Sequence, residues 1–329
     1  MSRRTSAAVI LALVVILSVG SLLIGANRIP LETGLHLLFR ADESFESIVI
    51  HQQRLPRTVL LIVIGAALAV AGALMQSMTR NPLADPGILG INAGASLAVV
   101  LAVVVFGVTS IWFYLWFAFG GAAAAAVVVY VLGGIGRADS SPARLALAGV
   151  AISMAISALV QTIILANQAA FNEFRLWAAG SAEGRGWDVI GAIAPFVVVG
   201  VLLACALGPA LNALALGIDS ARALGVRVNL VRTLTIVSIT LLAGAATAAV
   251  GPIMFVGLAV PFLVRAGFGA DQRLVIPICA LAGPVMMLLS DTLARVAGGT
   301  AEVQVGIMTA ILGGPFFIGI VRRRKLEAL

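Results

Sequence analysis

Long apolar runs separated by short charged segments dominate this chain. Uncharged stretches occupy residues 5–27, 58–79, 86–136, 145–172, 189–218, 233–264, 274–290 and 303–321. A bilayer core requires about 20 apolar residues per helix, so the stretch at 86–136 predicts two spans with a break near residues 107–111. The stretch at 233–264 predicts either one long helix or two that meet at Gly251-Pro252, because this pair interrupts helices. The pattern therefore predicts nine or ten spans.

The positions of the cationic residues favour ten spans. Short cytoplasmic loops carry an excess of Lys and Arg, and ten spans with an inside N-terminus place 14 of the 21 cations inside. These are Arg3, Arg4, Arg80, Arg137, Arg144, Arg222, Arg227, Arg232, Arg265, Arg273, Arg322, Arg323, Arg324 and Lys325. Nine spans would place the last four outside. We therefore predict ten transmembrane helices, cytoplasmic N- and C-termini, and a first span that is retained and not cleaved as a signal peptide.

Composition supports an integral membrane protein. Hydrophobic residues form 61% of the 329 residues, against about 45–50% in ordinary globular domains, and charged residues form 11% against about 25%. The mean hydropathy is +1.12. A soluble domain of this size would need more charged residues on its surface. We therefore predict an all-α polytopic membrane protein with one transmembrane domain over residues 1–329. The net charge of +7 is a topology signal, and no basic face interleaved with aromatics indicates nucleic-acid binding.

The reactive side chains exclude ATP hydrolysis by this chain. Lys325 is the single lysine, and no glycine-rich loop precedes it, so the chain lacks a P-loop for ATP phosphates. Cys205 and Cys279 lie in apolar stretches, which favours small buried hydrophobic side chains over metal ligands. We therefore expect no enzyme, no metal site and no cofactor, and any ATP-driven step must use another subunit.

One polar segment on the predicted cytoplasmic side is amphipathic. It reads LNALALGIDSARALGVRVNLVRT, and glycines at positions 217 and 225 are expected to divide it into two short helices. Such a pair can dock a soluble partner through its apolar face. It can equally lie on the lipid headgroups, and the residues alone do not choose between these alternatives.

Three arginines on the predicted external side run against the charge bias. Arg54 and Arg57 begin the second predicted span, and Arg295 follows Asp291 by four residues on the ninth. Anionic lipid, Glu46 or an acidic partner could compensate them. The simplest interpretation of Asp291 and Arg295 is an ion pair within one helix, worth a few tenths of a kcal/mol if exposed. The alternative is an external docking surface formed by all three arginines.

Polar residues within the spans are candidates for the wall of a transport pathway. Intramembrane polar groups usually face a bundle interior or a cavity. Gln161 and Gln168 are seven residues apart, which places them on one face of the predicted fifth span, and Gln76 lies in the second. Hydrogen bonding between helices would explain the same residues at least as well. After Gln76, two X-Pro turns and paired glycines predict a structured reversal, in which Asp85 caps the next helix.

Several motifs resemble the FecCD-type permeases, the membrane subunits of ABC importers for iron–siderophores, haem and cobalamin. The resemblance covers about residues 7 to 325 and lies in segments that read RLPRTVLLIVIGAALAVAGALMQSMTRNPLADPGILGINAGA, WAAGS from Trp177, LNALALGIDSARALGV, GPIMFVGLAVPFLVR, LLSDTLAR and EVQVGIMTAILGGPFFIGIVRR. Two positions depart from the family pattern. Phe262 stands where the family usually has His, and Gln304 stands where it usually has Pro.

The resemblance implies a particular machine. Ten helices would form a type II ABC importer permease fold of the cobalamin-permease kind, paired with a second permease that is a paralogue or a copy. Two ATP-binding subunits would dock on a cytoplasmic coupling loop, residues 212–228, and an extracytoplasmic siderophore-binding protein would dock on Arg54, Arg57 and Arg295. The coupling residues implied are Leu214, Ala215, Leu216, Gly217, Ser220, Ala221, Leu224 and Gly225.

The function expected is therefore that of a permease subunit of an ABC importer. It would form the pathway for a ferric siderophore across the cytoplasmic membrane of a bacterium. A haem or cobalamin permease of the same family is the alternative. An ion-coupled secondary transporter is the alternative from another class, and it would require ionisable residues buried at mid-membrane.

Overall fold

A computed structural model shows how these segments fold. It describes residues 3–25, 29–40, 42–107, 110–134, 142–298 and 303–322, and these contain helices, turns and loops but no strand. The helices are α1 (Arg3–Leu23), α2 (Leu31–Phe39), α3 (Phe45–Ile48), η1 (Val49–Arg54), α4 (Leu55–Thr79), η2 (Pro86–Leu89), α5 (Ile91–Phe106), α6 (Ile111–Leu132), α7 (Pro142–Ala166), α8 (Gln168–Ala178), α9 (Trp187–Ala215), α10 (Ile218–Ala223), α11 (Val228–Val250), α12 (Val256–Phe268), α13 (Gln272–Gly298) and α14 (Val305–Arg322). The all-α fold class is confirmed.

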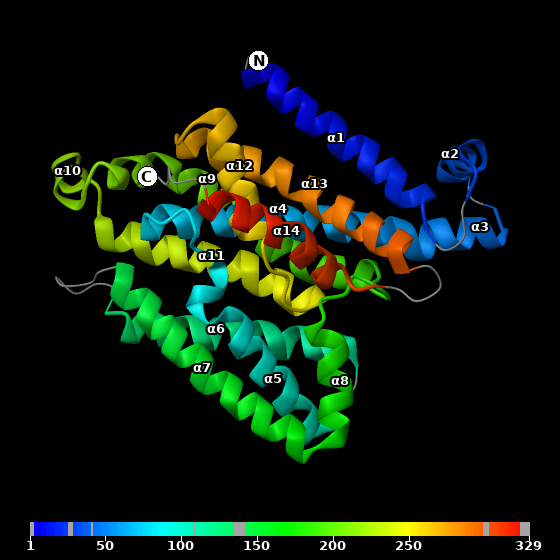
Figure 1. The fold of residues 1–329 in the computed structure, drawn as a ribbon, viewed down its shortest axis with the longest axis horizontal. Helices are drawn as coiled ribbons and strands as arrows, with labels where there is room; N and C mark the ends of the chain where they lie inside the picture. The colour runs from blue at the N-terminus through cyan, green and yellow to red at the C-terminus, as the bar shows by residue number, and fades with distance from the viewer. Residues whose placement is uncertain are drawn as a thin grey trace.

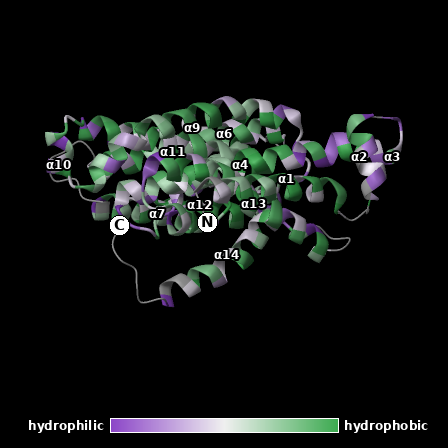
Figure 2. Ribbon diagram, turned by 90° about the horizontal axis from the view of Figure 1, so that it is seen from above, coloured by the Kyte–Doolittle hydropathy of each residue, from purple (hydrophilic) through white to green (hydrophobic). Residues whose placement is uncertain are grey.

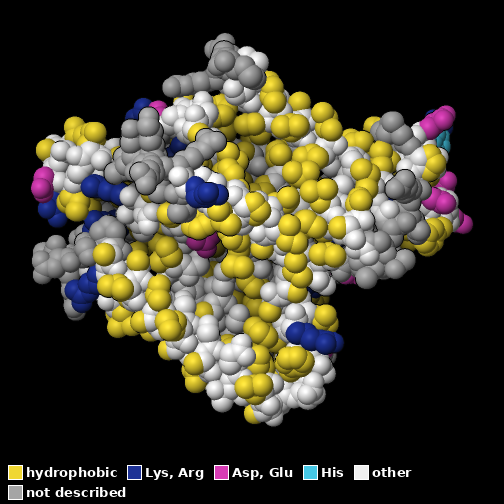
Figure 3. Space-filling model, viewed as in Figure 1, with side chains coloured by type: hydrophobic (Ala, Val, Ile, Leu, Met, Phe, Trp, Pro, Cys, Tyr) yellow, Lys and Arg dark blue, Asp and Glu magenta, His cyan; other side chains and the backbone are white. Residues whose placement is uncertain are grey.

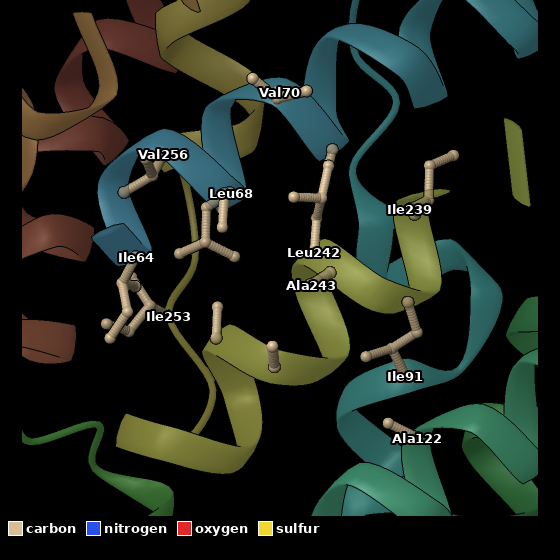
Figure 4. Packing of buried hydrophobic residues seen from close by; sticks show 14 of the residues in the cluster. Ile64, Leu68, Val70, Ile91, Ala122, Ile239, Leu242, Ala243, Ile253 and Val256 are labelled. Carbon is tan, nitrogen blue, oxygen red and sulfur yellow. The ribbon is translucent and has the colours of Figure 1, made fainter. Parts of the chain in front are cut away.

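Helix α4 occupies the middle of the bundle. It packs against α13, α11, α12 and α9, while α5, α6, α7 and α8 form a lobe that joins the rest mainly through α6 and α11 (Figure 1). Figure 4 shows where the two parts meet, with Leu68 and Val70 of α4, Ile239 and Leu242 of α11 and Ile91 of α5 in one apolar cluster. The core therefore lies where α4 and α11 come together.

Glycines let α4 approach two neighbours backbone to backbone. A Cβ atom added to Gly72 would lie 1.8 Å from the carbonyl oxygen of Gly257 in α12. A Cβ added to Gly283 in α13 would lie 1.9 Å from the carbonyl oxygen of Gly65. Helices in membranes gain contact area where small residues allow such approaches. These glycine pairs therefore set the spacing of α4, α12 and α13.

Seven helices are long and apolar enough to cross a membrane among the described residues, and three shorter apolar helices accompany them. The shorter ones are Ile91–Phe106, Val256–Phe268 and Val305–Gly319. Ten spans therefore remain a prediction. Of the cations used to orient the chain, Arg137, Arg323, Arg324 and Lys325 lie outside the described residues.

Two helix breaks occur where the apolar pattern predicts them. Helix α5 ends at Phe106, Gly107 follows with a left-handed φ of 63°, and α6 begins at Ile111. Helix α11 ends at Val250 and α12 begins at Val256, so the stretch at 233–264 forms two helices. Gly251 has φ of 80°, and a Cβ there would lie 2.1 Å from the carbonyl oxygen of Trp177, which leaves room only for glycine. Both breaks are confirmed.

The helical run that contains the second predicted span extends beyond the N-terminal end of that span. Its helical run starts at Phe45 and continues through α3, η1 and α4 to Thr79. Pro56 lies within the first two positions of α4, where its missing N–H costs little. The α-helix α4 begins directly after Arg54, as expected, but π-helical and α-helical turns precede it, so both Arg54 and Arg57 lie inside a continuous run of helix.

Polar elements gather at two opposite ends of the bundle. Helix α10, which carries Arg222, lies at one end, and α2 and α3 lie at the other (Figure 2). Between these ends, apolar side chains cover most of the visible face, and charged side chains are found mainly at the ends (Figure 3). The end with α10 corresponds to the predicted cytoplasmic side, and the end with α2 and α3 corresponds to the predicted external side. Each end carries one of the two candidate functional regions.

Candidate functional site

Three arginines converge at the predicted external end. Arg54 ends η1, Arg57 lies in the first turns of α4, and Arg295 lies near the end of α13. Each is buried, with 7%, 8% and 6% of its surface exposed. The structure therefore brings together the three residues that the sequence singles out, but it holds their side chains inside the bundle and not on an open surface.

Two of these arginines bind the end of α1. Arg54 Nη1 donates to the carbonyl oxygens of Leu22 and Leu23 at 2.8 and 3.0 Å. Arg295 Nη1 donates to the carbonyl oxygens of Ser21 and Ile24 at 3.0 and 2.7 Å. The last four carbonyls of a helix lack intrahelical donors, and the helix end carries partial negative charge. The arginines satisfy these carbonyls and fix the end of α1.

Asp291 joins Arg57 and Arg295 into one ionic cluster. Arg57 donates from Nε and Nη2 to Asp291 Oδ1 at 3.0 and 2.8 Å, and Arg295 Nε lies 3.0 Å from Asp291 Oδ2. The predicted pair within α13 is therefore present, but Asp291 is fully buried and also binds α4. The small free energy of an exposed pair does not apply, because a buried ion pair leaves a large penalty when one partner is removed.

A cavity of about 480 Å³ opens beside this cluster. It is lined by Gly25, Phe45, Val49, Gln52, Gln53, Arg54, Arg57, Glu183, Gly184, Arg185, Gly186 and Arg295. Arg185, in the loop between α8 and α9, is the lining cation that the sequence interpretation missed. Burial lowers the pKa of Arg185 to about 10, and the charge of Asp188 opposes this shift. The available signal was a cation flanked by Gly184 and Gly186 in a predicted external loop.

The predicted coupling loop lies at the opposite end of the bundle. Helix α9 ends at Ala215, Gly217 follows with φ of 116°, and α10 covers Ile218–Ala223. Gly225, with φ of 80°, precedes α11. The loop therefore contains one short helix, α10, and not the two that were expected, because the residues up to Ala215 belong to α9.

Two leucines of this loop face outward. Leu216 and Leu224 are 70% and 65% exposed, whereas Leu214 and Ala221 are buried against the bundle. Arg80, which ends α4 with a left-handed φ of 51°, donates to the carbonyl oxygen of Leu214. Asn212 Oδ1 accepts from the backbone N–H of Gln272 at 2.8 Å, and Asn212 Nδ2 donates to Asp271 at 2.6 Å. The loop is thus anchored to the bundle on one side and exposes two leucines on the other.

The candidate pathway residues do not form one wall. Gln76 is fully buried, donates to the carbonyl oxygens of Gly257 and Leu258 at 3.4 and 3.2 Å, and accepts from Arg265. It therefore ties α4 to α12. Gln161 lies exposed on α7, but α7 ends at Ala166, and Gln168 begins α8.

The interruption has a local cause. Asn167 accepts a hydrogen bond from the backbone N–H of Ala170 at 2.9 Å and caps α8. The prediction that Gln161 and Gln168 share one helix face is therefore wrong.

Phe262, at the position where the family usually has a histidine, packs edge-on against Phe316 of α14 with ring centroids 6.1 Å apart.

Comparison with known proteins identifies relatives along the whole chain. The model of the FecCD transport family matches residues 11–323. The ferric enterobactin transport system permease protein FepD of Escherichia coli (strain K12) is 41% identical over 96% of this chain and 94% of its own length. The Fe(3+)-citrate import system permease protein YfmD of Bacillus subtilis (strain 168) is 41% identical over 98% of this chain and 96% of its own length.

A solved structure has a similar fold. It is described as an inward-facing conformation of an ABC transporter of the metal-chelate type. Its TM-score is 0.85 at 28% sequence identity, and the match covers 98% of this chain and 100% of that chain.

Proposed function

Because this chain belongs to the FecCD transport family and is a permease of a metal-chelate-type ABC importer, we propose that its substrate is a ferric siderophore. The observation that supports this substrate is the similarity, at 41% identity over nearly the whole chain, to permeases named for ferric enterobactin and ferric citrate. Haem and cobalamin remain the alternatives within the family. Ion-coupled transport would require an ionisable residue free to exchange ions at mid-membrane, whereas Asp291 is held between two arginines.

The proposed assembly follows from the two ends of the bundle. Two ATP-binding subunits would dock at residues 212–228, a second permease would complete the pathway, and an extracytoplasmic siderophore-binding protein would dock at the end that carries Arg54, Arg57 and Arg295. The chain would lie in the cytoplasmic membrane of a bacterium with both termini inside. The outward Leu216 and Leu224 support the first contact, because exposed apolar side chains at a polar end suit a protein groove.

The substrate can be tested in a bacterial strain that lacks this permease, by comparing its iron uptake before and after the permease gene is restored. The restored strain should accumulate radioactive iron supplied as a ferric siderophore, and neither haem nor cobalamin should compete. Uptake of haem or cobalamin by the restored strain, with no uptake of any ferric siderophore, would replace the substrate and leave the transporter class unchanged.

Replacing Leu224 by aspartate should uncouple the importer. Its side chain is exposed, so folding should be unaffected, while burial of a leucine at a partner surface contributes about 1.5–3 kcal/mol. We expect ATPase association to weaken about 10- to 100-fold and uptake to fall to background, measured by co-purification and by iron uptake. Leu224→Met is the matched control and should retain both. Normal uptake by Leu224→Asp at normal protein abundance would refute the coupling role.

A further inference from the structure

An apolar groove of about 420 Å³ lies between α6 and α11, which run side by side (Figure 1). Ala123 and Val127 of α6 line one side of it, and Val237 and Leu241 of α11 line the other. Val127 and Val237 are exposed, so the groove opens on the outside of the bundle. Water does not fill a cavity with so apolar a lining. In a membrane, the groove must therefore be filled by an apolar group.

The groove is about as long as one leaflet of a bilayer is deep. Phe119 and Val131 both line it, and the twelve positions between them on α6 correspond to about 18 Å of helix. The hydrocarbon core of a bilayer is about 30 Å thick, so one leaflet contributes about 15 Å. Phe119 lies towards mid-membrane, where its ring packs against Phe196 of α9 with centroids 4.6 Å apart. This length suits one lipid acyl chain.

The cytoplasmic end of the groove is polar. The hydroxyl oxygens of Tyr130 and Thr233 lie 2.9 Å apart and form a hydrogen bond between α6 and α11. Tyr130 lies two residues before the last residue of α6, and Thr233 lies in the second turn of α11. Tyrosine is common where a membrane helix reaches the headgroups, because its ring is apolar and its hydroxyl is polar. The groove thus changes from apolar to polar in the direction in which a lipid does.

Positive charge lies just beyond this polar end. The guanidinium of Arg144, in the first turn of α7, reaches the end of α6, since a Cβ added to Gly134 would lie 3.4 Å from its Cζ atom. Arg227, which is exposed, immediately precedes α11. Helices α6, α7 and α11 contain no Asp or Glu. The charge at this end is therefore complementary to the phosphate of an anionic phospholipid.

We propose that the groove between α6 and α11 binds an anionic phospholipid of the inner leaflet. One acyl chain would lie between the two helices, and the phosphate would lie beyond Tyr130, near Arg144 and Arg227. The lobe of α5, α6, α7 and α8 joins the rest of the bundle mainly through α6 and α11. A lipid in this groove would therefore hold the two parts of the permease together, whichever chelate it carries.

The proposal can be tested by adding single lipids to the full-length permease after its native lipids have been removed in detergent. Dipalmitoyl phosphatidylglycerol should raise the unfolding temperature, because a ligand that binds only the folded state stabilises it. Dipalmitoyl phosphatidylcholine, which has the same chains and no net charge, should raise it less at equal concentration. Glycerol 3-phosphate, which has the phosphate and no chains, should have no effect. Native mass spectrometry would give the dissociation constant of each lipid.

A variant that fills the groove tests the place of the acyl chain. Ala123→Phe should weaken the binding of phosphatidylglycerol about 10- to 50-fold, because the new ring displaces about two or three methylene groups of the chain. Val128→Phe is the matched control, since Val128 is exposed on the same helix and does not line the groove. Its dissociation constant should equal that of the wild type. Equal binding by the wild type and Ala123→Phe would place the lipid elsewhere and overturn the proposal.

A second variant tests the place of the phosphate. Arg144→Gln should weaken the binding of phosphatidylglycerol about 5-fold, the usual contribution of one arginine near an anionic lipid, and leave that of phosphatidylcholine unchanged. Arg175→Gln is the control, because Arg175 is an exposed cation on α8 and does not line the groove. If Arg144→Gln weakened the binding of both lipids equally, or lowered the unfolding temperature without changing either dissociation constant, Arg144 would have a structural role only and the proposal would fail.

The remaining outcomes identify other occupants of the groove. Equal dissociation constants of the wild type for phosphatidylglycerol and phosphatidylcholine would make the groove a contact for bulk lipid. Stabilisation by glycerol 3-phosphate equal to that by phosphatidylglycerol would assign the arginines to a soluble anion. Either result would overturn the proposal and leave the transporter class unchanged.

Discussion

Replacement of Asp291 by leucine is expected to cost about 3–5 kcal/mol of stability, the penalty for breaking a buried ion pair by removing one partner. Asp291 is fully buried and binds Arg57 through Oδ1, while Arg295 lies 3.0 Å from Oδ2. Without the carboxylate, two buried guanidinium groups would lose their counter-charge. Because Arg295 also holds the carbonyls of Ser21 and Ile24, the attachment of α1 should weaken together with the contact between α4 and α13.

The loss of stability can be measured by thermal unfolding in detergent, with size-exclusion chromatography used to monitor the folded fraction. Asp219→Asn is a matched control, since Asp219 pairs with Arg222 at 3.6 Å in an exposed position on α10. Exposed pairs contribute about 0–1 kcal/mol, so this variant should unfold close to the wild-type temperature. If Asp219→Asn and Asp291→Leu lowered the unfolding temperature by similar amounts, the buried ion cluster would contribute no more stability than an exposed ion pair.

Replacement of Gly72 by alanine is expected to have the second large effect, with a loss of about 3 kcal/mol, at the upper end of the usual cost of overpacking a core. The new Cβ would lie 1.8 Å from the carbonyl oxygen of Gly257 and 2.5 Å from its Cα, and backbone atoms have no rotamer by which to move aside. Helices α4 and α12 would have to separate. That movement would also lengthen the hydrogen bonds from Gln76 to Gly257 and Leu258.

Gly120→Ala provides the control for Gly72→Ala. Gly120 lies within α6, and a Cβ there would meet nothing within 4 Å. Both changes raise helix propensity by about 1 kcal/mol, so the difference between the two unfolding temperatures isolates the α4–α12 contact. Equal unfolding temperatures for the two variants would refute the close packing of Gly72 on Gly257.

The arginine cluster changes how docking can be tested. Charge reversal at Arg54 and Arg57 would be expected to weaken docking if these arginines lay on an open surface. In the structure the same change would also remove hydrogen bonds to Leu22, Leu23 and Asp291. Loss of docking would then report misfolding as readily as a lost contact.

Local features of the sequence predicted several helix ends. The α5–α6 break at Gly107 and the α11–α12 break at Gly251 follow from residues whose own backbone preferences end a helix. Asp85 accepts a hydrogen bond from the backbone N–H of Gly87 at 2.8 Å, as predicted for a cap. Asn167 is likewise a residue type common at helix N-caps, and the helix boundary that it marks separates Gln161 from Gln168.

Hydropathy, charge and helix-breaking residues act over short lengths of chain, so the amino-acid pattern predicts a bundle of apolar helices with opposite polar ends. The roles of the polar side chains, by contrast, depend on the folded arrangement. Arg57 and Asp291 are separated by 234 positions, and Gln76 meets Gly257 only because the glycines of α4 allow α12 to approach. Such contacts depend on which helix faces meet, and that is set by packing across the whole bundle, which no local pattern records.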